Sequence, residues 1–130
     1  MEYFVSLLGS FLFGGMLLFS VGFGTLSFKF LETSVAKNFI RKTFPYFYNY
    51  TLFVSGLIFL LGLNISKAVG ALAFVIFAST IPTSKILMPA INKAADSKQK
   101  RNFVFLHTLS VAITISHIVI CAVILYLISV

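Results

Sequence analysis

The amino-acid sequence predicts an all-α integral membrane four-helix bundle that forms a single domain over residues 1–130. The chain is 59% hydrophobic and only 10% charged, which leaves too little polar surface to coat a water-soluble globule. Four apolar stretches are also each near or above the ~20 residues that a helix needs to cross ~30 Å of hydrocarbon. The expected spans are about 3–28, 44–63, 67–87 and 102–128.

The basic residues predict how the chain is threaded through the membrane. Nine of the ten Lys and Arg residues lie in the connectors after spans one and three, and only Lys67 lies on the other side. By the positive-inside rule we expect both connectors in the cytoplasm and both termini outside, in a bacterial inner membrane. Charges placed in this way are typical of topology signals near anionic headgroups, so we expect no nucleic-acid partner.

Span one is the glycine-rich helix of the chain. Ser6, Ser10 and Gly14 form a row of small residues at four-residue steps. Such rows let helix backbones approach closely in lipid, where van der Waals packing replaces the hydrophobic drive. We therefore expect this row to be a packing face within the bundle, with a face for self-association as the alternative.

The connector 29–43 has the pattern of a short amphipathic helix that lies on the membrane surface. Thr33 or Ser34 is expected to cap its start. Span two then opens with aromatic residues around Pro45, a residue that suits a first helical turn. The aromatics, Tyr46 among them, are typical of the headgroup boundary, and the alternative is a docking surface for a lipid or a partner helix.

The length of the two later connectors and the prolines near them predict their structure. Spans two and three are joined by only about residues 64–67 and must form a tight antiparallel hairpin. Pro82 is expected to kink or loosen the last turns of span three. Residues 89–96 are predicted to form a short helix, and Asp96 or Ser97 is expected to cap the final helix.

The last span carries a polar stripe on one face of an apolar helix. Its members recur at steps of three and four residues: His107, Ser110, Thr114, His117 and Cys121. A stripe of this kind must face protein or water rather than lipid. His107 is expected near the cytoplasmic boundary, within hydrogen-bond reach of Asn92 or Asp96. His117 is expected near the middle of the membrane.

The stripe also decides which chemistry is available. Away from their ends the spans contain no Asp, Glu, Lys or Arg, which disfavours coupled transport. No nucleophile with a base is visible, so we expect no enzyme and no catalytic residue. His117 and Cys121 are four residues apart and can reach one soft metal ion, with Met16 as a third ligand. We expect no cofactor and a His117 that is hydrogen-bonded to a serine or a carbonyl. The alternative is that His117 binds haem or a soft metal ion.

Three short motifs follow one another along the chain. They are Phe44, Pro45, Tyr46, Phe47 and Tyr48, then Pro89, Ile91, Asn92, Ala94 and Asp96, then His107 and Ser110 as His-x-x-Ser. In this order and spacing they resemble the transmembrane protein 205-like family of small four-helix membrane proteins, a domain of unknown function, over most of the chain. That family usually has asparagine where this chain has Thr114. The resemblance implies a ligand or interaction role for the motif residues and no settled activity.

Together these patterns predict a non-enzymatic binding or accessory component of a membrane complex. Its expected partners are the lipid bilayer and other membrane protein subunits or a second copy of the chain. Two alternatives stay open: a protein that handles metal or haem through His117 and Cys121, and a small transporter.

Overall fold

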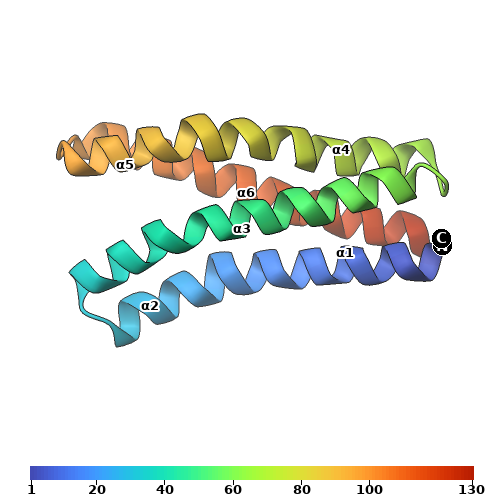
Figure 1. Cartoon of the computed structure of the whole chain (residues 1–130), viewed down its shortest axis with the longest axis horizontal. Helices are drawn as coiled ribbons and strands as arrows, with labels where there is room; N and C mark the ends of the chain where they lie inside the picture. The colour runs from blue at the N-terminus through green and yellow to red at the C-terminus, as the bar shows by residue number, and fades with distance from the viewer.

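The chain folds into four long helical segments joined by short turns (Figure 1). A computed structural model describes residues 1–130. The segments are Glu2–Phe30, Thr33–Gly62, Lys67–Asp96 and Lys100–Ser129, and each is long and apolar enough to cross a membrane. The predicted all-α class is thereby confirmed, and so is the presence of four helices long and apolar enough to span a membrane.

The first and third segments each contain a π-helical stretch. The elements are α1 (Glu2–Leu17), η1 (Leu18–Phe23), α2 (Gly24–Phe30), α3 (Thr33–Gly62), α4 (Lys67–Pro82), η2 (Thr83–Leu87), α5 (Met88–Asp96) and α6 (Lys100–Ser129). η2 begins directly after Pro82, which lacks an N–H and crowds the preceding turn. The predicted loosening at Pro82 is therefore confirmed, and so is the short helix that follows it.

The connector between spans one and two is not a separate surface helix. The chain is extended only at Leu31 and Glu32, and α3 then starts at Thr33 and runs unbroken through Pro45. The N-cap is Glu32, so neither Thr33 nor Ser34 fills that position. The expectation that Pro45 lies in a first helical turn is wrong, because no glycine or proline separates it from Thr33 and the helix starts earlier.

α3 and α4 form the predicted tight antiparallel hairpin, and they pack against each other along the bundle. The Ser66 side chain caps α4 by accepting a hydrogen bond from the Val69 N–H at 3.1 Å. Gly62 faces Val69 so closely that a Cβ atom on it would lie 2.7 Å from the valine Cγ1. Small residues therefore let the two backbones meet at this turn.

The turn between α5 and α6 ends one helix without capping the next. Lys98 has a φ of 55°, the Lys98 N–H bonds the Ala95 carbonyl, and the Gln99 N–H bonds the Ala94 carbonyl. This is the Schellman pattern that closes a helix C-terminus. The expected capping of α6 by Asp96 or Ser97 is wrong, because both residues are used in ending α5 and the N-cap is Gln99.

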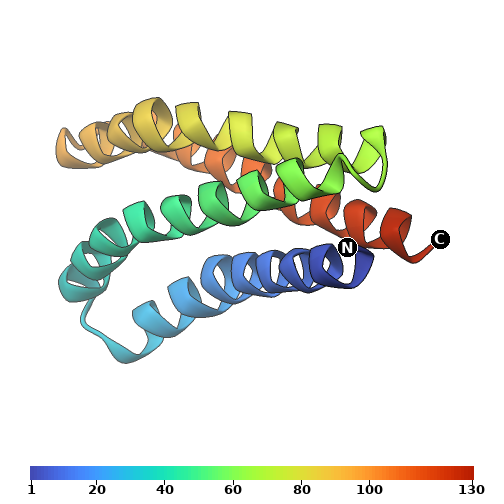
Figure 2. The same cartoon turned by 45° about the vertical axis from the view of Figure 1, so that its right-hand side comes forward.

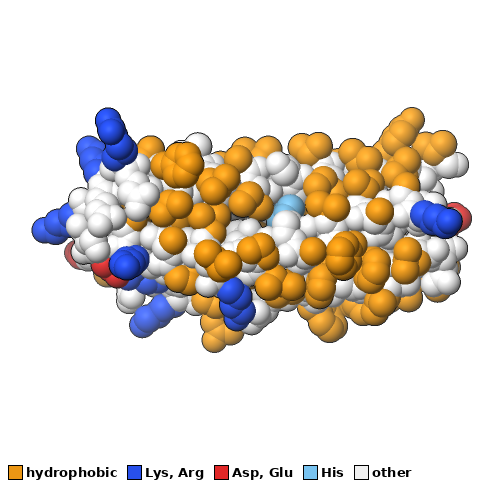
Figure 3. Space-filling model, turned by 90° about the horizontal axis from the view of Figure 1, so that it is seen from above, with side chains coloured by type: hydrophobic (Ala, Val, Ile, Leu, Met, Phe, Trp, Pro, Cys, Tyr) orange, Lys and Arg blue, Asp and Glu red, His pale blue; other side chains and the backbone are white.

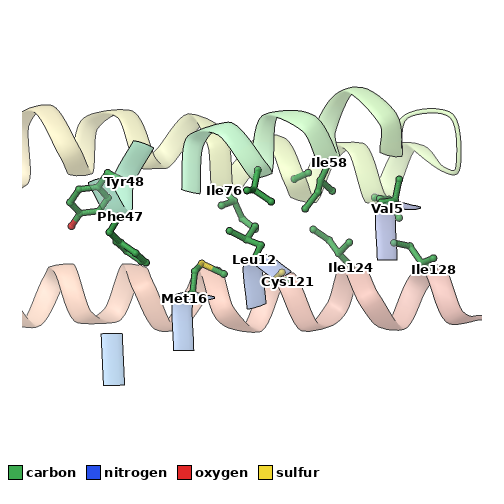
Figure 4. Close-up of a cluster of buried hydrophobic side chains, with 13 residues drawn as sticks. Val5, Leu12, Met16, Phe47, Tyr48, Ile58, Ile76, Cys121, Ile124 and Ile128 are labelled. Atoms are coloured by element: carbon green, nitrogen blue, oxygen red, sulfur yellow. The ribbon is translucent and has the colours of Figure 1, made fainter. Parts of the chain in front are cut away.

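The core lies along the bundle axis, where all four segments contribute apolar side chains. Figure 4 shows ten of its members between the helices: Val5, Leu12, Met16, Phe47, Tyr48, Ile58, Ile76, Cys121, Ile124 and Ile128. The packing face of α1 consists of Val5, Gly9, Leu12 and Met16, which are buried. The row of small residues at 6, 10 and 14 is not that face, because it is rotated one residue away from it and is exposed at two of its three positions.

Candidate ligand-binding cavity

The two ends of the bundle differ sharply in charge. Both termini lie at one end, whereas the 31–32 turn and the 97–99 turn lie at the other (Figures 1 and 2). We call the latter the basic end, because it carries nine of the ten Lys and Arg residues and only Glu32 and Asp96 as acids. Figure 3 shows the Lys and Arg side chains gathered mainly at this end and apolar side chains along the flanks.

A cavity of about 700 Å³ opens near the basic end. Its walls come from η1 and α2, from the first turns of α3, from α5 and from α6. The cavity exists because the first segment diverges from α6 toward the basic end. Its first part, α1, packs against both α3 and α6, whereas α2 continues along α3. Figure 2 shows α2 well separated from the start of α6.

The structure brings three of the predicted site residues together in this cavity. Asn92 comes from α5, and His107 and Ser110 come from α6; all three line the wall. Ser110 is buried, whereas His107 is exposed and stacks on Phe103 with ring centroids 5.6 Å apart. Thr114, the residue that departs from the family pattern, lines the same wall one turn deeper.

Asp96 is hydrogen-bonded to Arg41 and not to His107. Its carboxylate accepts two hydrogen bonds from the Arg41 guanidinium, at 3.0 and 3.3 Å, and this contact joins α5 to α3. The pair lies where the side chains are 41% and 64% exposed. His107 has no hydrogen bond to Asn92 or Asp96, because the long Arg41 side chain reaches the carboxylate first and the imidazole turns along its own helix toward Phe103. The expected His107 bond is therefore wrong.

His117 lies deeper in the bundle and ties α6 to α4. Its Nε2 is 2.7 Å from the Ser79 hydroxyl oxygen, and the Ser79 hydroxyl donates to the Val75 carbonyl at 2.6 Å. Because a hydroxyl has one proton, the His117 Nε2–H donates to Ser79 in this arrangement. The expectation that His117 is hydrogen-bonded to a serine within the bundle is confirmed.

The other two residues proposed as metal ligands belong to the packed core. The Cys121 thiol donates to the Gly9 carbonyl at 3.3 Å and joins α6 to α1. Met16 is fully buried in the same cluster. His117 and Cys121, four residues apart on α6, are thus bonded to different helices. Metal or haem binding by this set stays a prediction.

Pro45 and Tyr46 do not line the large cavity. Tyr46 is exposed and lies at the edge of a smaller aromatic pocket of about 320 Å³ between η1 and α3. The residues that sequence reasoning missed are on α3, where Lys37, Arg41 and Phe44 line the large cavity. Their three- and four-residue spacing indicated that they share one face of a helix. That this face lies opposite α6 could be seen only in the folded structure.

Comparisons with models of protein families, with curated proteins and with solved structures find no match for this chain. The resemblance to the transmembrane protein 205-like family therefore stays an expectation from the sequence. The case for a function depends on the geometry of the cavity.

Proposed function

We propose that this protein is a non-enzymatic integral membrane protein that binds a membrane ligand in the cavity at the basic end. The cavity itself supports the proposal. Its volume of about 700 Å³ falls within the ~300–1,000 Å³ typical of ligand pockets. Its lining combines apolar side chains with a few polar groups, such as Asn92, His107 and Ser110, that can orient a ligand.

The surface of the bundle supports placement in a bilayer. Large apolar side chains are exposed on every segment, among them Phe11, Phe53, Phe74 and Ile115. In the proposed orientation the basic end faces the cytoplasm and both termini face outward, which follows the positive-inside rule. In a bacterial cell the membrane is the inner membrane.

A binding role fits the chemistry of the cavity better than catalysis does. The nearby Asp96 carboxylate is engaged by Arg41, and His107 is stacked on Phe103. Neither group is paired with a nucleophile in the way that acyl or phosphoryl transfer needs. In a larger membrane assembly the protein would act as the component that holds the ligand.

The proposal is tested by native mass spectrometry of protein extracted from its own membranes in mild detergent. The wild type is expected to carry a non-covalently bound mass. Thr114→Phe fills the cavity and should lose that mass, whereas Val119→Phe, on an exposed part of α6 outside the cavity, should keep it. Circular dichroism and melting curves establish that both variants fold. A wild-type protein without a bound mass, or equal ligand occupancy in the two variants, contradicts the proposal.

A further inference from the structure

The polarity of the cavity changes along its length. Its lining on α6 runs from Lys100 to Ile118, 18 residue-to-residue steps that cover about 27 Å at ~1.5 Å per step. The lining is basic at the start of the helix, polar through His107 and Thr114, and purely apolar from Ile115 onward. A ligand that follows this wall must therefore be charged at one end and apolar at the other.

The charged end of the cavity carries an excess of positive charge. Four cationic side chains line it, Lys37, Arg41, Lys98 and Lys100, and no carboxylate does. The single ion pair of the protein occupies Arg41, so the three lysines have no ionic partner. Placing an anionic group among them removes their mutual repulsion and adds favourable Coulomb energy.

The backbone adds a second attraction for an anion at the same place. Gln99 and Lys100 line the cavity where α6 begins, and no side chain caps that helix. The first N–H groups of a helix lack intrahelical partners and carry the positive end of the helix dipole. Together with the lysines they form a site suited to a phosphate group.

The apolar end of the cavity favours a lipid over a soluble anion. Val21 from η1 and Val111 and Ile115 from α6 line it, and these side chains are 60%, 41% and 56% exposed. Exposed apolar walls at membrane depth give the cavity a side that faces the acyl chains of the bilayer. A molecule can then enter from the membrane with its headgroup toward the basic end.

We propose that the ligand is a membrane lipid with an anionic phosphate headgroup, which Lys37, Lys98, Lys100 and the start of α6 hold while an acyl chain lies along Phe44, Val111 and Ile118. This inference rests on the proposed function, since it names the ligand class of the same cavity. Basic pockets at the cytoplasmic ends of transmembrane helices are a known means of binding acidic headgroups.

The test is native mass spectrometry of delipidated protein titrated with equal amounts of phosphatidylglycerol and phosphatidylcholine. The wild type is expected to prefer phosphatidylglycerol by about tenfold or more, because each lysine near the headgroup adds to the attraction. The triple variant Lys37→Gln, Lys98→Gln, Lys100→Gln should lose the preference. The matched control Lys29→Gln, Lys42→Gln, Lys93→Gln removes the same charge at the same end, outside the cavity, and should keep it.

The outcomes separate this inference from the proposed function. Equal binding of both lipids would overturn the anionic class and leave the ligand-binding role standing, whereas binding of neither lipid would count against both. Equal loss in the two triple variants would show a diffuse charge effect and overturn the assigned site. Displacement of phosphatidylglycerol by inorganic phosphate alone would overturn the choice of a lipid over a free anion.

Discussion

The bundle has a packed part and an open part built from the same four segments. From His117 toward the termini, hydrogen bonds from side chains link different helices: His117–Ser79, Cys121–Gly9 and Tyr50–Phe11. Toward the basic end the one such link is the exposed Arg41–Asp96 pair, and the cavity lies beside it.

Residue size explains this difference. In the packed part, glycines stand where a side chain would collide with a neighbour, as Gly9 does against Leu125 and Gly15 against Tyr50. In the open part, the facing positions carry bulky residues such as Phe44 and Phe103 and long cations such as Lys37. Close approach of the helices thus stabilises one part, while the other keeps a space for a ligand.

The largest effect is expected where a glycine allows close approach. A Cβ atom at Gly15 would lie 2.7 Å from Cζ of Tyr50 and would press on its hydroxyl, whereas a Cβ atom at Gly14 would meet nothing within 4 Å. Gly15→Leu should therefore lower the free energy of unfolding by about 1–3 kcal/mol, and the neighbouring Gly14→Leu should leave it nearly unchanged. Unfolding in mixed micelles measures both. Equal effects would refute the close contact between Gly15 and Tyr50.

A smaller effect is expected at the hydrogen bond between α4 and α6. A double-mutant cycle of His117→Leu and Ser79→Ala should give a coupling energy of about 0.6–1.7 kcal/mol, between the average and the maximum found for polar contacts between membrane helices. The cycle isolates the pair, because the Ser79 hydroxyl keeps its own bond to Val75 in the histidine variant. Strictly additive effects of the two substitutions would show that the pair does not interact.

The smallest effect is expected in the open part. The Arg41–Asp96 pair is exposed, so water and salt screen it and such pairs contribute only about 0.2–1 kcal/mol. Asp96→Asn should change the free energy of unfolding by no more than this, and less in high salt. A loss of several kcal/mol, independent of salt, would mean that the ion pair and not the core holds this end together.

Apolar length and proline chemistry made much of the fold predictable. The four long apolar helices, the α3–α4 hairpin and the loosened turn after Pro82 follow from local sequence. The helix faces were not predictable in the same way. The row from Ser6 to Gly14 was expected to be the packing face of α1, but the buried face runs from Val5 to Met16. The separate surface helix was wrongly predicted, because an amphipathic pattern does not say whether a helix ends before the next apolar run.

The candidate site was predictable only along single helices. The three- and four-residue steps of α6 placed His107, Ser110 and Thr114 on one face, and all three line the cavity. The hydrogen bond expected from His117 to a serine or a carbonyl is made with Ser79. The Arg41–Asp96 pair joins residues 55 positions apart, and the α3 wall of the cavity follows from helix packing that no local pattern contains.

The central claim is that the open part holds an anionic lipid, and photo-crosslinking in native membranes tests it most directly. A photoreactive residue at Val111 lies in the cavity wall, whereas one at Leu109 lies at almost the same depth on an exposed face of α6 outside the cavity. Lipid adducts from position 111 are predicted to be enriched in anionic phospholipids, and those from position 109 to match the bulk bilayer. The same lipid composition at both positions would contradict the claim.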